Sequence, residues 1–145
     1  MKKIEIYSDG GSRGNPGPAA CAFVVFEGKS KLHEEKRYLG NATNNVAEYI
    51  GVLMALSWLG KQNKQYSVDF YLDSQLVQRQ LSGEYKIKNK NLIKIFNKIN
   101  IHLKNYQGKI KFIHVKRSKN KISDRLVNEA LDENLQEFTS SKINS

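Results

Sequence analysis

The sequence of 145 residues has one cysteine, two prolines and no long apolar run, and each of these shortages excludes a class of protein. The lone Cys21 cannot form an internal disulfide or complete a thiolate zinc site. So few prolines, with ten glycines, exclude a collagen-like or low-complexity chain. No stretch approaches the roughly 18 apolar residues of a membrane span, and the start of the chain lacks the apolar core of a signal peptide. We therefore expect a cytoplasmic protein with no membrane partner.

Negative charge is also scarce, because 24 Lys and Arg residues face 14 Asp and Glu residues and give a net charge of +10. An excess of this size favours a polyanionic partner, most often nucleic acid. The alternative is a compositional bias, since 19 lysines against 5 arginines, with many Asn and Ile residues, are typical of an AT-rich genome. Charge alone leaves both explanations open.

The pattern of apolar residues predicts five strands and four helices. The strands are expected at residues 3–8, 19–26, 31–39, 68–73 and 109–115, and the helices from Thr43 and over 73–83, 90–105 and 122–138. Three strands followed by alternating helices and strands predict an α/β protein with a mixed sheet flanked by helices. We expect a single domain over residues 1–138 and a flexible C-terminal tail over residues 139–145.

A glycine-rich segment at residues 10–18, GGSRGNPGP, predicts a loop between the first two strands. Its spacing is not that of a P-loop or a dinucleotide-binding loop, and it runs into a strand rather than a helix. A nucleotide-binding function is therefore disfavoured. Glycines can nevertheless bring the backbone close to a sugar-phosphate chain.

Four acidic residues stand where predicted elements end or begin. Asp9 and Asp73 follow apolar strands, and Glu48 and Asp124 fall in the first turns of helices. Each has a local explanation: Asp9 as a turn former, Asp73 as a helix cap, Glu48 in a capping box with Asn45, and Asp124 as a partner of the helix dipole.

The four carboxylates also allow a joint explanation. If the strand before Asp73 lies parallel to the first strand, Asp9 and Asp73 meet at the edge where open α/β sheets bind ligands. Several carboxylates at one crevice repel each other unless a cation lies there. All-oxygen ligands suit Mg²⁺ or Mn²⁺, and two such ions about 4 Å apart are typical of enzymes that cleave phosphodiesters.

Four blocks of the sequence resemble, in order, the type 1 ribonuclease H family. They contain SDGGSRGNPG, TNNVAE, LDSQ, and the loop KRSKNKIS with the Asp that follows it. The resemblance as a whole extends over about residues 4–132. The resemblance implies a ribonuclease H-like fold, with a five-stranded mixed sheet of strand order 3-2-1-4-5 flanked by helices. It also implies an endonuclease that hydrolyses the RNA strand of RNA–DNA hybrids and leaves 3′-hydroxyl and 5′-phosphate ends.

The resemblance assigns roles to individual residues. The family's catalytic, metal-binding carboxylates match Asp9, Glu48, Asp73 and Asp124. Two Mg²⁺ ions are expected during catalysis, with Mn²⁺ as an alternative; one would activate the attacking water and the other would stabilise the leaving 3′-oxygen. The family's substrate-binding positions match Ser12, Asn15, Thr43, Asn44 and Gln75. Asn15, Thr43 and Asn44 correspond to contacts with the DNA strand and nearby hybrid. Ser12, Asn44 and Gln75, with Glu48, correspond to contacts around RNA 2′-hydroxyls.

The loop before the last acidic residue departs from part of the family. Many relatives have a histidine there that is thought to assist proton or product transfer, whereas residues 116–123 contain none. Lys119 and Asn120 are candidates to take over that role.

The segment after the third acidic residue resembles one subgroup of the family. Another subgroup has a long basic, tryptophan-rich protrusion there, but residues 82–92 are short and contain no tryptophan. Lys86, Lys88 and Lys90 are candidates for phosphate contacts in its place, and a solvated charged surface is the alternative.

Two other functions stay open. One is a non-catalytic module that binds hybrids or double-stranded RNA on the same fold; the presence of all four carboxylates argues against it. The other is a phosphoryl-transfer domain that joins DNA strands at the same metal site, against which the Gly-Asn-Pro-Gly loop argues. We expect a monomer whose partner is an RNA–DNA hybrid.

Overall fold

The computed structural model describes residues 1–144, with side chains described for residues 1–134. The strands are β1 (Lys2–Ser12), β2 (Gly17–Glu27), β3 (Ser30–Ala42), β4 (Tyr66–Leu72) and β5 (Lys109–His114). The helices are α1 (Asn44–Gly60), α2 (Gln75–Leu81), α3 (Lys90–Asn105) and α4 (Lys121–Asn144), with a short 3₁₀ turn η1 (Arg117–Lys119) before α4.

The five strands form one mixed sheet in the order β3-β2-β1-β4-β5. β2 pairs antiparallel with both β1 and β3, whereas β4 pairs parallel with both β1 and β5. This arrangement confirms the predicted α/β class and the strand order 3-2-1-4-5.

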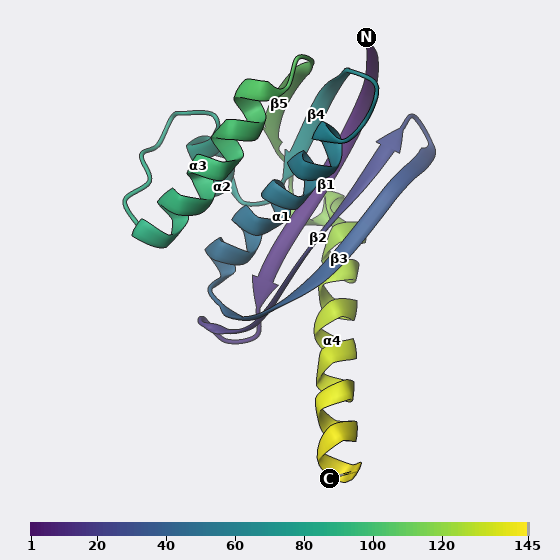
Figure 1. Cartoon of the computed structure of the whole chain (residues 1–145), viewed down its shortest axis with the longest axis vertical. Coiled ribbons are helices and arrows are strands. Elements are labelled where there is room, and N and C mark those ends of the chain that lie inside the picture. Colours follow the sequence, from purple (N-terminus) through teal and green to yellow (C-terminus); the bar gives the residue numbers. More distant parts are fainter. Residues whose placement is uncertain (145) are drawn as a thin grey trace.

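Helices cover both faces of the sheet and bury two separate apolar clusters (Figure 1). Helices α1, α2 and α3 pack on one face, where Ile4 and Ile6 of β1 and Phe70 of β4 are fully buried. On the other face, α4 packs its apolar residues against the alanines Ala20 and Ala22 of β2. The small alanine side chains leave room for the helix to lie close to the strands.

The site-bearing end of the sheet is set by the register of its two central strands. The parallel pairing of β1 with β4 ends at Tyr7 opposite Tyr71, so Asp9 and Asp73 each follow the last pair by two residues. β1 continues to pair with β2 as far as Ser12. The predicted loop at residues 10–18 is therefore wrong at both ends, because only residues 13–16 connect the strands.

Helix α4 runs to Asn144, six residues beyond the predicted end at residue 138. No glycine or proline interrupts residues 121–144, so no sequence signal stops the helix there. The side chains of residues 135–145 lie outside the described part, and the predicted domain boundary and flexible tail stay predictions. None of the described helices is both long enough and apolar enough to cross a membrane.

Candidate active site

Three carboxylates converge where the pairing of β1 with β4 ends and α1 begins. One carboxylate oxygen from each of Asp9, Glu48 and Asp73 lies within 4.8 Å of the other two. Asp9 is only 9% exposed, and Glu48 and Asp73 are half-buried. The structure thus brings together three of the four predicted carboxylates, which we call the carboxylate cluster.

Glycine at position 10 allows this convergence. A Cβ atom on Gly10 would lie 2.3 Å from the backbone carbon of Ala47, so only glycine lets β1 approach the first turn of α1 so closely. A Cβ atom on Gly51, one turn further along α1, would lie 3.0 Å from the carbonyl oxygen of Asp9. The close contact between strand and helix places Asp9 beside Glu48.

Burial and mutual repulsion raise the pKa of two members of the cluster. Burial, and then the charge of Asp73, raise the pKa of Asp9 to about 7, although the Gly10 N–H donates to Asp9 Oδ1 at 2.9 Å. Burial, and then the charges of Asp9 and Asp73, raise the pKa of Glu48 to about 8. The arrangement is therefore costly for three bare negative charges and suited to a bound cation, which the all-oxygen donor set would hold as Mg²⁺ or Mn²⁺.

Asp124 lies in the first turn of α4, outside the three-carboxylate cluster. It is half-buried, and its charge contributes to the raised pKa of Asp9. Arg117 in η1 acts in the opposite direction and lowers the pKa of both Asp9 and Glu48. The fourth predicted carboxylate thus acts electrostatically on Asp9 from the first turn of α4.

The predicted substrate-binding residues gather beside the cluster. Asn44 Oδ1 accepts hydrogen bonds from the backbone N–H of Ser12 at 2.8 Å and from its hydroxyl at 3.1 Å. Asn15 Oδ1 accepts from the backbone N–H of Asn44 at 3.0 Å. Four of the five therefore lie where the β1–β2 connection meets the start of α1: Ser12, Asn15, Thr43 and Asn44. The fifth, Gln75, is exposed at the start of α2.

The structure contradicts the local capping explanations of Glu48 and Asp73. Thr43 is the N-cap of α1, with Oγ1 accepting from Val46 N–H at 3.2 Å, so the capping role considered for Asn45 is wrong. Ser74 is the N-cap of α2, so Asp73 does not cap that helix. Helix capping is thus supplied by neighbours of the acidic residues.

Sequence reasoning missed the part played by Asn120. Its side chain is 1% exposed, and its amide contacts Asp73, which is a different placement from that of an exposed proton carrier. In the sequence, an asparagine four residues before a helical aspartate is typical of an N-cap of that helix. Nothing local in the sequence indicates that its partner lies 47 residues away.

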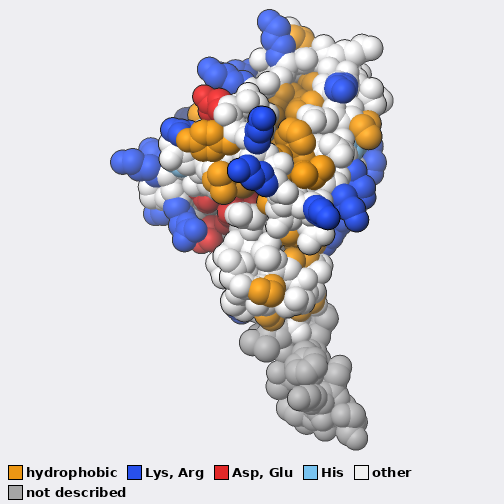
Figure 2. All heavy atoms as spheres, turned by 90° about the vertical axis from the view of Figure 1, so that its left-hand side faces the viewer, with side chains coloured by type: hydrophobic (Ala, Val, Ile, Leu, Met, Phe, Trp, Pro, Cys, Tyr) orange, Lys and Arg blue, Asp and Glu red, His pale blue; other side chains and the backbone are white. Residues whose placement is uncertain are grey.

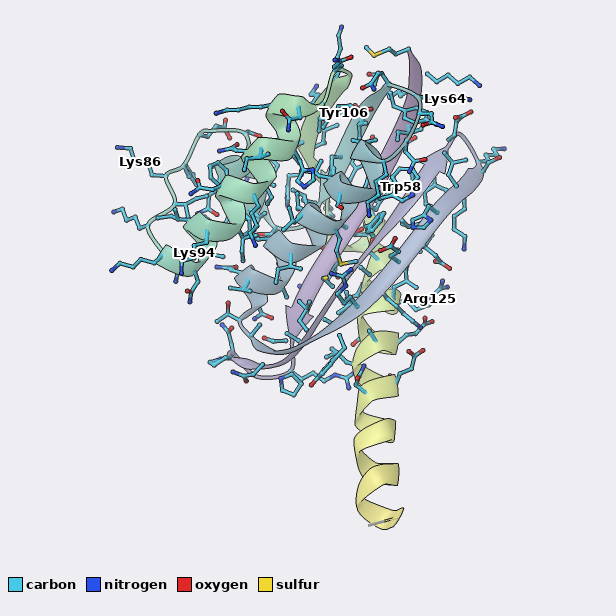
Figure 3. All side chains as sticks on the ribbon, in the orientation of Figure 1. Trp58, Lys64, Lys86, Lys94, Tyr106 and Arg125 are labelled. Carbon is cyan, nitrogen blue, oxygen red and sulfur yellow. The ribbon has the colours of Figure 1, made fainter. Side chains whose placement is uncertain are left out.

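A second candidate surface lies between α2 and α3. We call residues 84–90 the lysine segment. Lys86, Lys88 and Lys90 are exposed there, and Figure 3 shows Lys86 pointing away from the protein. Figure 2 views this side and shows Lys and Arg side chains spread over it. The segment is held from inside by Ile87, which packs against the main apolar cluster.

Comparisons with known proteins agree with this geometry. The RNase H family model matches residues 1–134. A ribonuclease H of Clostridium botulinum is 32% identical over 152 aligned positions, which cover 92% of this chain and 98% of that protein. A bifunctional protein of Mycobacterium tuberculosis is 39% identical over 132 residues, or 90% of this chain. The chain spans only 36% of the length of that mycobacterial protein.

A solved structure extends the similarity to the whole fold. The crystal structure of LC11-RNase H1 in complex with an RNA/DNA hybrid matches with a TM-score of 0.86 and 42% sequence identity. The match covers 91% of this chain and 99% of that one.

Proposed function

The chain belongs to the RNase H family, and from this premise we propose that it is a metal-dependent endonuclease of RNA–DNA hybrids. It hydrolyses the RNA strand by a two-metal-ion mechanism and leaves 3′-hydroxyl and 5′-phosphate ends. The observation that carries the proposal is the carboxylate cluster, in which oxygens of Asp9, Glu48 and Asp73 lie within 4.8 Å of one another. The similar fold of a relative bound to an RNA/DNA hybrid supports the substrate.

The residues of the site fit divalent cations. Their donors are all carboxylate oxygens, which is the ligand chemistry of Mg²⁺ and Mn²⁺. In the proposal, Asp9, Glu48, Asp73 and Asp124 hold the ions. When bound, two such ions supply an activated water nucleophile and charge stabilisation for the leaving oxygen.

The chain's own residues supply position and electrostatics. In the proposal, four residues surround 2′-hydroxyls of the RNA strand: Ser12, Asn44, Glu48 and Gln75. Asn15, Thr43 and Asn44 bind the DNA strand and the nearby hybrid. The hydrogen bonds from Ser12 to Asn44, and from Asn44 to Asn15, support a preformed surface that binds without rearranging. Amides and hydroxyls of this kind bind sugars and phosphates rather than base edges, so we expect little sequence preference.

The experiment is incubation of the purified protein with a hybrid labelled on either strand, with and without Mg²⁺, followed by analysis of the product ends. We expect Mg²⁺-dependent cleavage of the RNA strand alone, with 3′-hydroxyl and 5′-phosphate ends. Binding of the hybrid without cleavage would replace the proposal with a non-catalytic module. Cleavage or joining of DNA strands would replace it with the phosphoryl-transfer alternative.

A further inference from the structure

Asn120 is a fully buried polar residue that bonds to three elements at once. Its side-chain amide donates to the carbonyl oxygen of Ser8 at 2.9 Å and to Oδ2 of Asp73 at 3.0 Å. Its side-chain oxygen accepts from the hydroxyl of Ser123 at 2.7 Å. Both amide hydrogens and the amide oxygen therefore have partners, which a side chain 1% exposed needs.

These partners are the neighbours of three predicted metal ligands. Ser8 precedes Asp9 on β1, and Asp73 is itself a ligand at the end of β4. The backbone of Asn120 accepts from the N–H of Asp124 at 3.1 Å. One residue thus joins β1 and the end of β4 to the first turn of α4, with 112 positions of sequence separating Ser8 from Asn120.

We propose that Asn120 is a positioning residue that orients the Asp73 carboxylate for the cation and ties Asp124 to β1 and to the end of β4. This role rests on the proposed function of the site. An amide donor fixes one carboxylate oxygen by a charge-assisted hydrogen bond, and it adds no positive charge that would compete with a cation. The amide neither gains nor loses a proton near neutral pH, which argues against Asn120 in the proton-transfer role.

The alternative is that Asn120 only stabilises the fold, as many buried polar residues do. The two roles differ in what the folded variant retains. Loss of a positioning residue weakens cation binding by the folded protein, because the hydrogen-bond partners of metal ligands are worth about 10–100-fold in affinity or activity. Loss of a purely structural residue lowers the melting temperature and leaves the folded fraction with its normal cation affinity.

The test compares Asn120→Ala with Gln80→Ala at a temperature where circular dichroism shows that both are folded. Gln80 is the matched control, because it is also a buried amide with a side-chain partner, Tyr49, and no hydrogen bond joins its side chain to a carboxylate of the cluster. Affinity for Mn²⁺ alone is measured by electron paramagnetic resonance, and kcat and KM are measured with a hybrid in Mg²⁺. For Asn120→Ala we expect Mn²⁺ affinity and kcat to fall by about 10–100-fold, with KM nearly unchanged. For Gln80→Ala we expect both to stay near wild type.

A double-mutant cycle with Asp73→Asn identifies the residue through which Asn120 acts. If Asn120 acts through Asp73, adding Asn120→Ala to Asp73→Asn should cost much less Mn²⁺ affinity than adding it to the wild type. Wild-type Mn²⁺ affinity in folded Asn120→Ala, or an equal loss in both backgrounds, would overturn the proposal. A wild-type protein that cuts no hybrid would overturn the proposed function instead, and the Mn²⁺ titration would still decide the role of Asn120.

Discussion

The carboxylate cluster and the lysine segment each collect charges of one sign, but they do so under opposite physical conditions. Oxygens of Asp9, Glu48 and Asp73 lie within 4.8 Å of one another, with Asp9 buried and the other two half-buried. Lys86, Lys88 and Lys90 have long, flexible side chains and are exposed to solvent. In the first region burial, and then mutual repulsion, raise the pKa values of Asp9 and Glu48. In the second region, solvent and salt screen the repulsion between the lysines.

The difference indicates that the two regions have different roles. Repulsion between closely packed carboxylates favours a bound cation, and a rigid backbone is needed to hold them together. The close approach at Gly10 and the hydrogen bond from Asn120 to Asp73 contribute to that rigidity. Exposed like charges require no frame and attract a polyanion over a longer range. We therefore expect changes at the cluster to alter chemistry and stability, and changes at the lysine segment to alter salt-dependent binding.

The largest expected effect is loss of cleavage on replacing a cluster carboxylate. Asp9→Asn and Asp73→Asn each remove a charged ligand while keeping the shape of the side chain. Cleavage of a labelled hybrid in Mg²⁺ should fall by more than about a hundredfold, the upper limit typical of merely removing a hydrogen-bond partner of a ligand. Circular dichroism should show an intact fold. Activity within about tenfold of wild type in either variant would contradict the assignment.

Removal of 2′-hydroxyls from the substrate should have the next largest effect. A hydrogen bond to a neutral hydroxyl contributes about 0.5–1.5 kcal/mol, and more with a charged acceptor such as Glu48. Losing two or three should slow cleavage about 10–1,000-fold, since about 1.4 kcal/mol is tenfold. The measurement uses hybrids with a single 2′-deoxy or 2′-methoxy sugar at successive positions around the cut. An all-DNA duplex cut as fast as the hybrid would disprove these contacts.

Gly10→Ala should disturb the frame of the cluster without changing any charge. The new Cβ atom would meet the backbone of Ala47 at 2.3 Å, so β1 and α1 must separate. Overpacking of this kind costs about 1–3 kcal/mol of stability, and we expect cleavage to fall with it. Gly11→Ala is the matched control, because its Cβ atom would lie 3.8 Å from the nearest atom, Asn44 Oδ1. Equal melting temperatures for the two variants would contradict the close-approach argument.

Alternation and element order were sufficient to predict the α/β class, which the structure confirms. They left the parallel pairing of β1 with β4 as a condition, and the strand order was predicted from the resemblance to type 1 ribonuclease H. Given that pairing, the meeting of Asp9 and Asp73 followed, since parallel strands run to the same edge of a sheet.

The sequence was not sufficient for the range of the β1–β2 connection. The sequence pattern predicts Gly10 and Gly11 to be loop residues. In the structure Gly10 lies inside a strand, where only glycine fits beside the backbone of Ala47, 37 residues away. A local sequence pattern does not predict such a long-range contact.

The position of Asn120 was unpredictable for a related reason. Its capping-like sequence context is local, whereas its partners Ser8 and Asp73 come from two other strands. The end of α4 was also missed, because neither a glycine nor a proline marks where the helix stops. Patterns of polarity predict elements and faces, and they do not predict which distant polar groups a buried amide will satisfy.

Stability should depend on pH in a way that only the carboxylate cluster explains. The pKa values of Asp9 and Glu48 are raised on folding from ordinary values of 3.8 and 4.5 to about 7 and about 8. The folded protein therefore holds protons that the unfolded chain has released. This contribution is fully present below the unfolded pKa values and is lost as pH rises through the folded ones. Metal-free protein should thus lose stability between about pH 4 and pH 8.

The measurement is urea unfolding of the metal-free protein and of Asp9→Asn across this pH range. The difference in unfolding free energy isolates the Asp9 contribution, and the variant should become relatively more stable as pH rises. Mg²⁺ should reduce the loss in the wild type, because bound cations replace the protons. A difference that does not vary with pH would show that Asp9 is ionised in the folded protein at ordinary carboxylate pH values.

The smallest effect should come from the lysine segment, because each exposed lysine contributes only a screened interaction with phosphate. Replacing Lys86, Lys88 and Lys90 together with Ala should lower the magnitude of the slope of log K against log salt for hybrid binding. The expected decrease is about 0.7–0.9 for each phosphate that the variant no longer neutralises. The control variant replaces Lys29, Lys61 and Lys64, three exposed lysines near the opposite end of the sheet, where β4 begins. It removes the same charge, so a long-range effect of net charge would change both slopes equally. Only direct binding of phosphates at the lysine segment would change the first slope more than the second, and an unchanged slope would make that segment a solvated surface.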